Sequence, residues 1–198
     1  MLTFDEPSHT YRWNDVVVPS VTQVLKPLTS YDHVKPDALE RARQEGTAIH
    51  YMVECDCKRI AIDLPDWMKG HWEAWQKFVA ETGFECWASE QRGYHALYRY
   101  AGTMDLVGEL KHLSLTGPTL LDVKRSFYGG PTIGLQLAAY QKLLEQDKGF
   151  PKIKNRLALR LMADGKYQLL PFTDANDGNT FFAQLALHNW KTKHGKHD

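Results

Sequence analysis

The hydrophobic period of this chain changes at Phe84, and that change limits the folds open to it. Between Pro36 and Gly83, apolar residues recur at the three- and four-residue spacing of helices that bury one face. From Phe84 to Lys124, they follow the shorter period of strands, in runs bounded by turn-forming residues. Helices followed by a strand meander predict an α/β or α+β fold, in which a mixed central sheet is flanked by helices.

The segment after Phe84 contains the predicted strands of this sheet. FECWASEQ, HALYRYAG and TMDLVGEL form an antiparallel meander, with turns or bulges at Arg92-Gly93 and Ala101-Gly102. TLLDVKRS is apolar before its charged end, which is typical of a central, buried strand. A helix over about 132–146, the strands RLALRLM and YQLLPF, and a closing helix FFAQLALHNWKTK complete the prediction.

The first residues predict a small extension ahead of this core. TYRW and VVV flank the turn-forming pair Asn14-Asp15, which indicates a hairpin. Ser20 and Gln23 have the spacing of a capping box, so a short helix should follow. We expect one domain over residues 1–198, with a hairpin and helix extension over about 1–35.

Composition argues against several classes of protein. The chain has 24 Lys+Arg and 24 Asp+Glu, a net charge of +0, so any nucleic-acid partner has to be argued from local chemistry. Cys55, Cys57 and Cys86 lack the paired spacing of a zinc or iron-sulfur site, and we expect reduced thiols. A charged N-terminal segment and the lack of a long apolar run predict a soluble, cytoplasmic protein without a membrane span.

The candidate chemistry lies in the strand TLLDVKRS. Asp122 and Lys124 are two residues apart, so their side chains share one face of the strand. Taken alone, the pair is more typical of a salt bridge at a strand end. Asp105, in a neighbouring strand, brings a second carboxylate toward Asp122, and converging carboxylates favour a bound Mg²⁺ or Mn²⁺. Lys124 would then orient a water molecule and stabilise charge on a phosphate.

Five motifs in order resemble the PD-(D/E)XK nuclease superfamily. They are GTAIH at 46–50, Glu90, GTMD at 102–105, LDVK at 121–124 and QLAAY at 136–140. The set is most similar to the RecB-like, phage-type exonuclease branch, which includes the mitochondrial genome maintenance exonuclease and CRISPR-associated RecB-like nucleases. The resemblance implies a restriction-endonuclease-like core. Two features depart from the family pattern, because Met104 stands where the family name implies Pro, and Asp122 is the shorter of the two allowed acids.

The resemblance also implies a role for each matching residue. It makes His50, Asp105 and Asp122 metal ligands. It adds the backbone carbonyl of Val123 as a further ligand, and it makes Lys124 the catalytic lysine. Two Mg²⁺ or Mn²⁺ ions are implied. No iron-sulfur cluster is expected, because the relatives that carry one have four cysteines around the nuclease core.

Other residues have supporting roles by the same resemblance. Glu90 is an auxiliary acid near the second metal ion or its waters, and Gln136 and Tyr140 face the site from the following helix. The residues expected to contact DNA phosphates are Arg125, Ser126, Arg41 and Arg43.

Each of these residues also has an ordinary structural interpretation. His50 could be a helix histidine without a ligand role, Tyr140 a core residue and Gln136 a surface residue. Tyr98 could stack on unpaired bases, although packing between strands is the more common use of such an aromatic residue.

Together, the residues and the resemblance favour a Mg²⁺-dependent DNA exonuclease that hydrolyses phosphodiester bonds with a metal-activated water. Recombination or repair in a phage or mobile element is the implied setting, with a single-strand annealing protein or oligomerisation as sources of processivity. The alternatives are a structure-specific endonuclease with the same site, a catalytically silent DNA-binding subunit, and a metal hydrolase of small phosphorylated molecules.

Overall fold

A computed structural model describes residues 1–29, 34–112, 115–125, 130 and 132–195, which form two sheets and the helices around them. The smaller sheet is antiparallel and has the order β1-β2-β3, formed by Leu2–Asp5, Thr10–Trp13 and Val16–Val18. The larger sheet has the order β4-β5-β6-β7-β8, formed by Glu85–His95, Tyr100–Leu110, Gly117–Lys124, Asn155–Leu161 and Tyr167–Pro171. Strands β6 and β7 pair in parallel and the other neighbours pair antiparallel, so this sheet is mixed.

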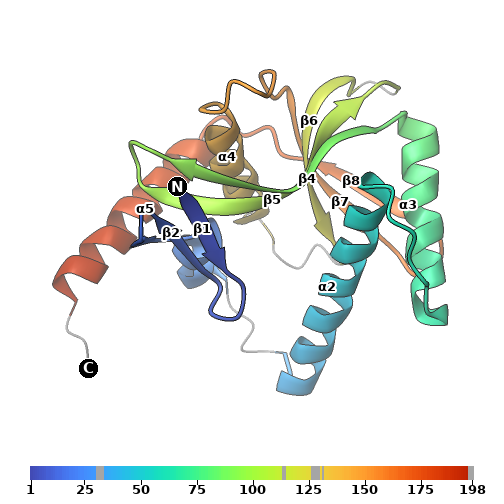
Figure 1. Cartoon of the computed structure of the whole chain (residues 1–198), viewed down its shortest axis with the longest axis horizontal. Coiled ribbons are helices and arrows are strands. Elements are labelled where there is room, and N and C mark those ends of the chain that lie inside the picture. Colours follow the sequence, from blue (N-terminus) through green and yellow to red (C-terminus); the bar gives the residue numbers. More distant parts are fainter. Residues whose placement is uncertain (30–33, 113–114, 126–129, 131, 196–198) are drawn as a thin grey trace.

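Helices cover both faces of the larger sheet (Figure 1). One face packs against α1 (Val21–Leu25), α4 (Thr132–Leu144) and α5 (Asp177–His194). The other face packs against α2 (Pro36–Cys57) and α3 (Lys69–Thr82). Short 3-10 turns at Lys26–Leu28 and Asp66–Met68 follow α1 and precede α3. The predicted class, a mixed central sheet flanked by helices, is confirmed.

Several local predictions are confirmed at the level of single residues. The Ser20 side chain accepts a hydrogen bond from the backbone amide of Gln23 at 3.1 Å, and the Gln23 side chain accepts one from the Ser20 amide at 3.0 Å. This capping box starts α1. Strand β6 is central, and its residues 119–123 are buried. The predicted hairpin is present as β2 and β3, and an additional strand, β1, which was not predicted, pairs with β2.

The predicted meander is wrong in its turns. The segment contains two strands of 11 residues each, β4 and β5, joined by a turn over residues 96–99. Gly93 and Gly102 are a cross-strand pair inside this ladder, where turns or bulges were expected. A Cβ atom on Gly102 would lie 2.6 Å from Cε1 of Tyr140, and one on Gly93 would lie 3.0 Å from Cβ of Leu143. The glycines therefore permit α4 to pack closely on the sheet.

The small N-terminal sheet docks against the start of β5. The backbone amide of Ala101 donates a hydrogen bond to the carbonyl of Pro19 at 3.0 Å, and Ser20 forms an isolated bridge with Ala101. Tyr11 and Val18 are buried together with Ala101. These contacts place the N-terminal sheet beside the β4–β5 end of the larger sheet. Among the described residues, every helix is too short or too polar to cross a bilayer.

Candidate metal centre and catalytic cleft

A cleft of about 790 Å³ opens between α2, the N-terminal sheet, β4, β5 and α4. Helix α2 presents one face to it, since residues at helical spacing, from Arg43 through Gly46 and Thr47 to His50 and Glu54, line the wall. The space beside Gly46 is open, and this glycine lies on the cleft wall. The sequence-predicted residues that line the cleft are Arg43, His50, Glu90, Asp105, Lys124, Gln136 and Tyr140.

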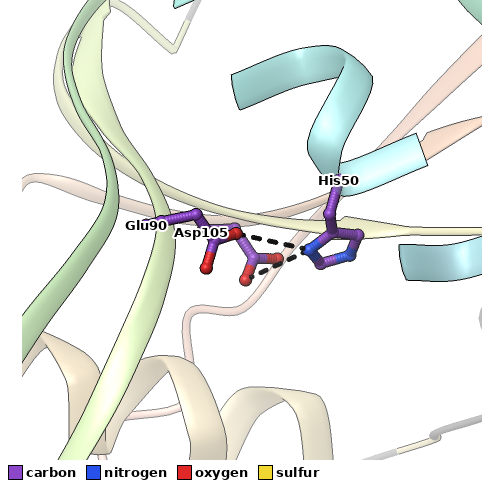
Figure 2. A group of neighbouring side chains, drawn as sticks. All are labelled: His50, Glu90 and Asp105. Atoms are coloured by element: carbon purple, nitrogen blue, oxygen red, sulfur yellow. Dashed lines mark ion pairs between the residues drawn. The ribbon is translucent and has the colours of Figure 1, made fainter. Parts of the chain in front are cut away.

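His50, Glu90 and Asp105 converge in this cleft from three different elements (Figure 2). Nδ1 of His50, on α2, lies 3.7 Å from Oε1 of Glu90, on β4, and 3.6 Å from Oδ1 of Asp105, on β5. Each residue offers one ligand atom, and the three atoms lie within 4.8 Å of one another. One imidazole nitrogen and two carboxylate oxygens at this separation can hold a divalent cation.

The backbone of Val123 orients two members of this group. Its carbonyl accepts a hydrogen bond from Nε2 of His50 at 2.8 Å, which leaves Nδ1 as the ring nitrogen that faces the carboxylates. Its amide donates to Oδ2 of Asp105 at 2.7 Å, so that Oδ1 turns toward His50. The predicted role of the Val123 carbonyl as a metal ligand stays a prediction, since in this structure the carbonyl orients the histidine.

Both strands that carry the acids are irregular at the site. Glu90 has a φ of 50°, a left-handed conformation that costs a non-glycine residue about 1 kcal/mol. On β5, Met104 and Leu106 belong to the cores on opposite faces of the sheet, although residues two apart on a regular strand share a face. The regular pleat is therefore interrupted at Asp105. Backbone strain that coincides with a side-chain cluster is typical of functional sites.

Asp122 and Lys124 form an ion pair beside the three-residue group. Nζ of Lys124 lies 2.7 Å from Oδ2 of Asp122, and the Asp122 side chain is only 1% exposed, whereas that of Lys124 is 28% exposed. Oδ1 of Asp122 is buried and has no hydrogen-bond partner in the described part of the chain. Asp122 is not one of the residues whose ligand atoms lie within 4.8 Å, so its predicted metal role stays a prediction.

The pKa values in the cleft reflect its crowded charges. Burial alone lowers the pKa of the His50 imidazole, but the carboxylates of Asp105 and Glu90 outweigh it and raise the pKa to about 9. Burial, reinforced by the Asp105 carboxylate and opposed by the Lys124 ammonium, raises the pKa of Asp122 to about 6. The carboxylates of the cleft are therefore crowded together, and that of Asp122 is poorly solvated.

These observations fit a divalent metal ion. The donor atoms are the hard oxygen and imidazole ligands that Mg²⁺ and Mn²⁺ accept. The buried Oδ1 of Asp122, which has no protein partner in the described part of the chain, and the carboxylates that raise the pKa of His50 are what is expected of residues arranged to hold a divalent cation.

Gln136 and Tyr140 lie one helical turn apart on α4 and line the cleft, as predicted. Nε2 of Gln136 donates a hydrogen bond to the Tyr140 hydroxyl at 3.1 Å. Burial raises the pKa of Tyr140, with the Asp105 carboxylate adding to the effect. Tyr140 therefore remains a neutral phenol beside His50, Glu90 and Asp105.

The four residues predicted to contact DNA have different surroundings. Arg43 lines the cleft and lies 4.0 Å from Glu40, whereas Arg41 is exposed elsewhere on α2 and does not line the cleft. The Nε of Arg125 lies 2.6 Å from Oε2 of Glu45, which ties the end of β6 to α2 outside the cleft lining. Ser126 lies outside the described residues.

The N-terminal sheet forms a wall of the cleft that sequence reasoning missed. Phe4 and Tyr11 from this sheet face Arg92 on β4 and Thr103 on β5, and all four line the cleft. A signal for Arg92 and Thr103 was present in the sequence, because each lies two residues from a predicted acid, Glu90 or Asp105. Phe4 and Tyr11 had no such signal.

The packing of Tyr98 favours the ordinary interpretation of that residue. Its ring stacks on Phe182 of α5, with the ring centroids 4.2 Å apart. Tyr98 does not line the cleft, so its position does not support base stacking there.

Comparisons with known proteins gave structural likeness only. No protein-family model matches the chain, and no curated protein matches its sequence. The crystal structure of SSO0001 is similar at 12% identity, covering 88% of this chain and 80% of that one, with a TM-score of 0.42. An alkaline exonuclease (LHK-Exo) from Laribacter hongkongensis is similar at 15% identity, covering 88% of this chain and 90% of that one, with a TM-score of 0.41. The same exonuclease in complex with dAMP is similar at 15% identity, covering 89% and 92%, with a TM-score of 0.41. The chemistry of the cleft therefore has to be argued from its own residues.

Proposed function

We propose that this protein is a metal-dependent nuclease of the PD-(D/E)XK type that hydrolyses DNA phosphodiester bonds, starting from a DNA end. One observation carries the proposal. His50, Glu90 and Asp105 place their ligand atoms within 4.8 Å of one another in an open cleft, beside a buried carboxylate paired with a lysine. The order of the motifs that supply these residues supports the same reading.

Each residue has a defined part in this proposal. His50, Glu90 and Asp105 would hold a divalent ion, with Asp122 and the Val123 carbonyl available to complete one or two sites. A bound Mg²⁺ or Mn²⁺ would polarise a phosphate oxygen and lower the pKa of a water molecule.

Lys124 supplies the positive charge that the reaction needs at the phosphate. Its ammonium is held by Asp122 at 2.7 Å, and enough of its side chain is exposed to reach a bound phosphodiester. A cation fixed beside the scissile group stabilises the negative charge that develops as the phosphate is attacked. Gln136 and Tyr140 offer hydrogen-bond donors to the same phosphate from α4.

The action on DNA ends and the setting in phage or mobile-element recombination and repair belong to the proposal, supported by the motif resemblance. So does the possibility that an annealing protein or a second copy of the chain contributes processivity. Since the net charge is +0, binding to DNA would depend on cations gathered in the cleft and not on the overall charge.

The test compares end-labelled linear DNA with covalently closed circular DNA. In Mg²⁺ or Mn²⁺, the wild type should shorten the linear DNA and leave the circle intact, and a chelator should abolish cleavage. Lys124→Ala should fold and bind DNA but lose activity by about a hundredfold or more, because it removes a charge that acts mainly in the transition state. Cleavage of the circular DNA would show that the protein is an endonuclease and not an exonuclease. Binding of the wild type without cleavage of either DNA would favour a catalytically silent DNA-binding subunit.

A further inference from the structure

The wall of the cleft formed by the N-terminal sheet contains a four-residue arrangement next to the metal-binding group. Phe4 and Tyr11 are a cross-strand pair of β1 and β2, with ring centroids 4.5 Å apart. Arg92 and Thr103 are a cross-strand pair of β4 and β5. The two pairs face each other across the junction of the sheets.

Specific contacts hold the two pairs together. The Arg92 guanidinium lies 4.8 Å from the centroid of the Phe4 ring, in the position of a cation–π contact. The Tyr11 hydroxyl and Oγ1 of Thr103 are 2.6 Å apart and share a hydrogen bond. Tyr11 is buried and Phe4 is half-buried, while Arg92 remains exposed in the cleft. The aromatic pair therefore acts as a fixed support for the arginine.

The charge environment of Arg92 differs from that of the other cations that line the cleft. Lys124 is paired with Asp122 at 2.7 Å, and Arg43 lies 4.0 Å from Glu40. Arg92 has no carboxylate partner within ion-pair distance among the described residues, and it contacts an aromatic ring in place of an acid. A guanidinium held in this way is suited to bind a planar or tetrahedral oxyanion such as a phosphate.

The spacing between this arginine and the metal-binding group is short. Arg92 and Thr103 each lie two residues along the chain from Glu90 and Asp105, a backbone separation of at most about 7 Å, since both strands are irregular at the acids. That distance is comparable to the separation of neighbouring phosphates in a nucleic-acid strand. A strand with its scissile phosphate at the acids would therefore bring the next phosphate to Arg92.

We propose that Arg92, supported by Phe4 and Tyr11, binds the phosphate adjacent to the scissile one, and that the N-terminal sheet is thereby part of the substrate site. This inference rests on the proposed nuclease function and names a residue that determines how the DNA strand is placed. The contact is to the backbone, so it is independent of base sequence.

The experiment measures binding of a short fluorescein-labelled DNA by anisotropy over a range of salt concentrations, in the Lys124→Ala background and with Mg²⁺. Arg92→Met should weaken binding roughly tenfold and reduce the slope of log affinity against log salt by about one. Arg92→Lys should keep the slope. Phe4→Leu should weaken binding less than Arg92→Met, since it loosens the guanidinium without removing it.

Arg12→Met is the matched control. Arg12 lies on β2 next to Tyr11, its side chain is exposed, and it does not line the cleft. It should leave both affinity and salt slope unchanged. Thermal melting of each variant separates lost binding from lost folding, and a destabilised Arg92→Met is replaced by Arg92→Gln in the same assay.

Cleavage kinetics separate this inference from the proposed function. With Lys124 restored, Arg92→Met should raise KM while kcat changes by no more than about twofold. A wild type that cleaves DNA, together with an Arg92→Met variant of unchanged affinity, salt slope and KM, overturns the phosphate site alone. An equal effect of Arg12→Met also overturns it. A wild type that binds DNA without cleaving it overturns the proposed function. In that case, the salt dependence of binding by Arg92→Met still shows whether Arg92 contacts a phosphate.

Discussion

The carboxylate of Asp105 accepts a hydrogen bond from the backbone amide of Val123 at 2.7 Å. Strands β5 and β6 pair from Leu110 with Gly117 to Leu106 with Leu121. Asp105 and Val123 lie just beyond the last pair, so the Asp105 side chain links the two strands where the backbone ladder has ended. Oδ2 of Asp105 therefore helps to hold β5 and β6 together, while Oδ1 faces His50.

This double use predicts different outcomes for two substitutions of Asp105. Asp105→Asn should fold, because its amide oxygen can still accept from Val123, but it should lose metal binding and activity. Asp105→Ala should also be less stable than Asp105→Asn, by about 1 to 3 kcal/mol, since it leaves the Val123 amide without a partner. Denaturant unfolding measures the difference in stability. Adding Mn²⁺ should raise the melting temperature of the wild type alone. Equal stability of the two variants would contradict the structural role of the carboxylate.

The left-handed conformation of Glu90 predicts an unusual pair of variants. Glu90→Gly and Glu90→Ala both remove the carboxylate, and both should weaken metal binding and cleavage. Because glycine adopts a φ of 50° without steric strain, Glu90→Gly should be more stable than Glu90→Ala by about 1 kcal/mol. In a regular strand the order would be reversed. Urea unfolding of the two metal-free variants is the measurement, and the reversed order would mean that Glu90 is not strained.

The buried carboxylate of Asp122 predicts a gain in stability when it is neutralised. Asp122→Asn should raise the free energy of unfolding of the metal-free protein at pH 8 by about 1 to 3 kcal/mol, because a buried charge with an unpaired oxygen is removed. Lys124 is partly exposed, so it can be solvated when its partner is lost. Cleavage should fall at the same time. Asp66→Asn, at a side chain that is 94% exposed, is the control and should change neither property. A destabilised Asp122→Asn would show that the ion pair holds the strand end together.

The buried imidazole of His95 leads us to expect a loss of folding stability in mild acid. Burial, with the Lys142 ammonium adding to it, lowers the pKa of the His95 imidazole below 6.5. The ring stacks on Tyr100 at 5.4 Å and hydrogen-bonds to Gln146. Below pH 6.5 the unfolded chain takes up a proton that the folded protein resists. The stabilising effect is therefore complete above pH 6.5 and is lost as the pH falls through the lowered pKa.

The measurement is the free energy of unfolding of wild type and His95→Gln between pH 7 and pH 5, where the variant should show a shallower decline. His112→Gln, which changes an exposed histidine, should follow the wild type. Parallel curves for wild type and His95→Gln would contradict the prediction.

Local patterns in the sequence predicted local structure well. The Ser20–Gln23 capping box and the apolar run that ends at Lys124 depend on residues a few positions apart, and both are present in the structure. Gly102 was misread because its reason lies in Tyr140, a residue of another element, which comes within 2.6 Å of a Cβ at that position. Spacing alone cannot distinguish a glycine that turns the chain from one that admits a neighbouring side chain.

In the candidate site, too, the sequence predicted some residues and not those whose role depends on contacts between distant elements. The acids and the lysine could be selected because their motifs follow one another in a fixed order, and the structure brings His50, Glu90 and Asp105 together. The orienting role of Val123 and the wall built by Phe4 and Tyr11 could not be predicted, since they depend on how distant elements dock. No periodicity in the first strands indicates that they meet β4 and β5.

The bond between Tyr11 and Thr103 joins positions 92 residues apart, and it has a consequence for synthesis on the ribosome. Strands β1 and β2 leave the exit tunnel before β5 has been synthesised, so the surface on which they dock is not yet present. Synthesis must have passed Thr103 before the N-terminal sheet can dock beside Arg92 and Thr103. A nascent chain should therefore form the cleft only after the two long strands, β4 and β5, have paired.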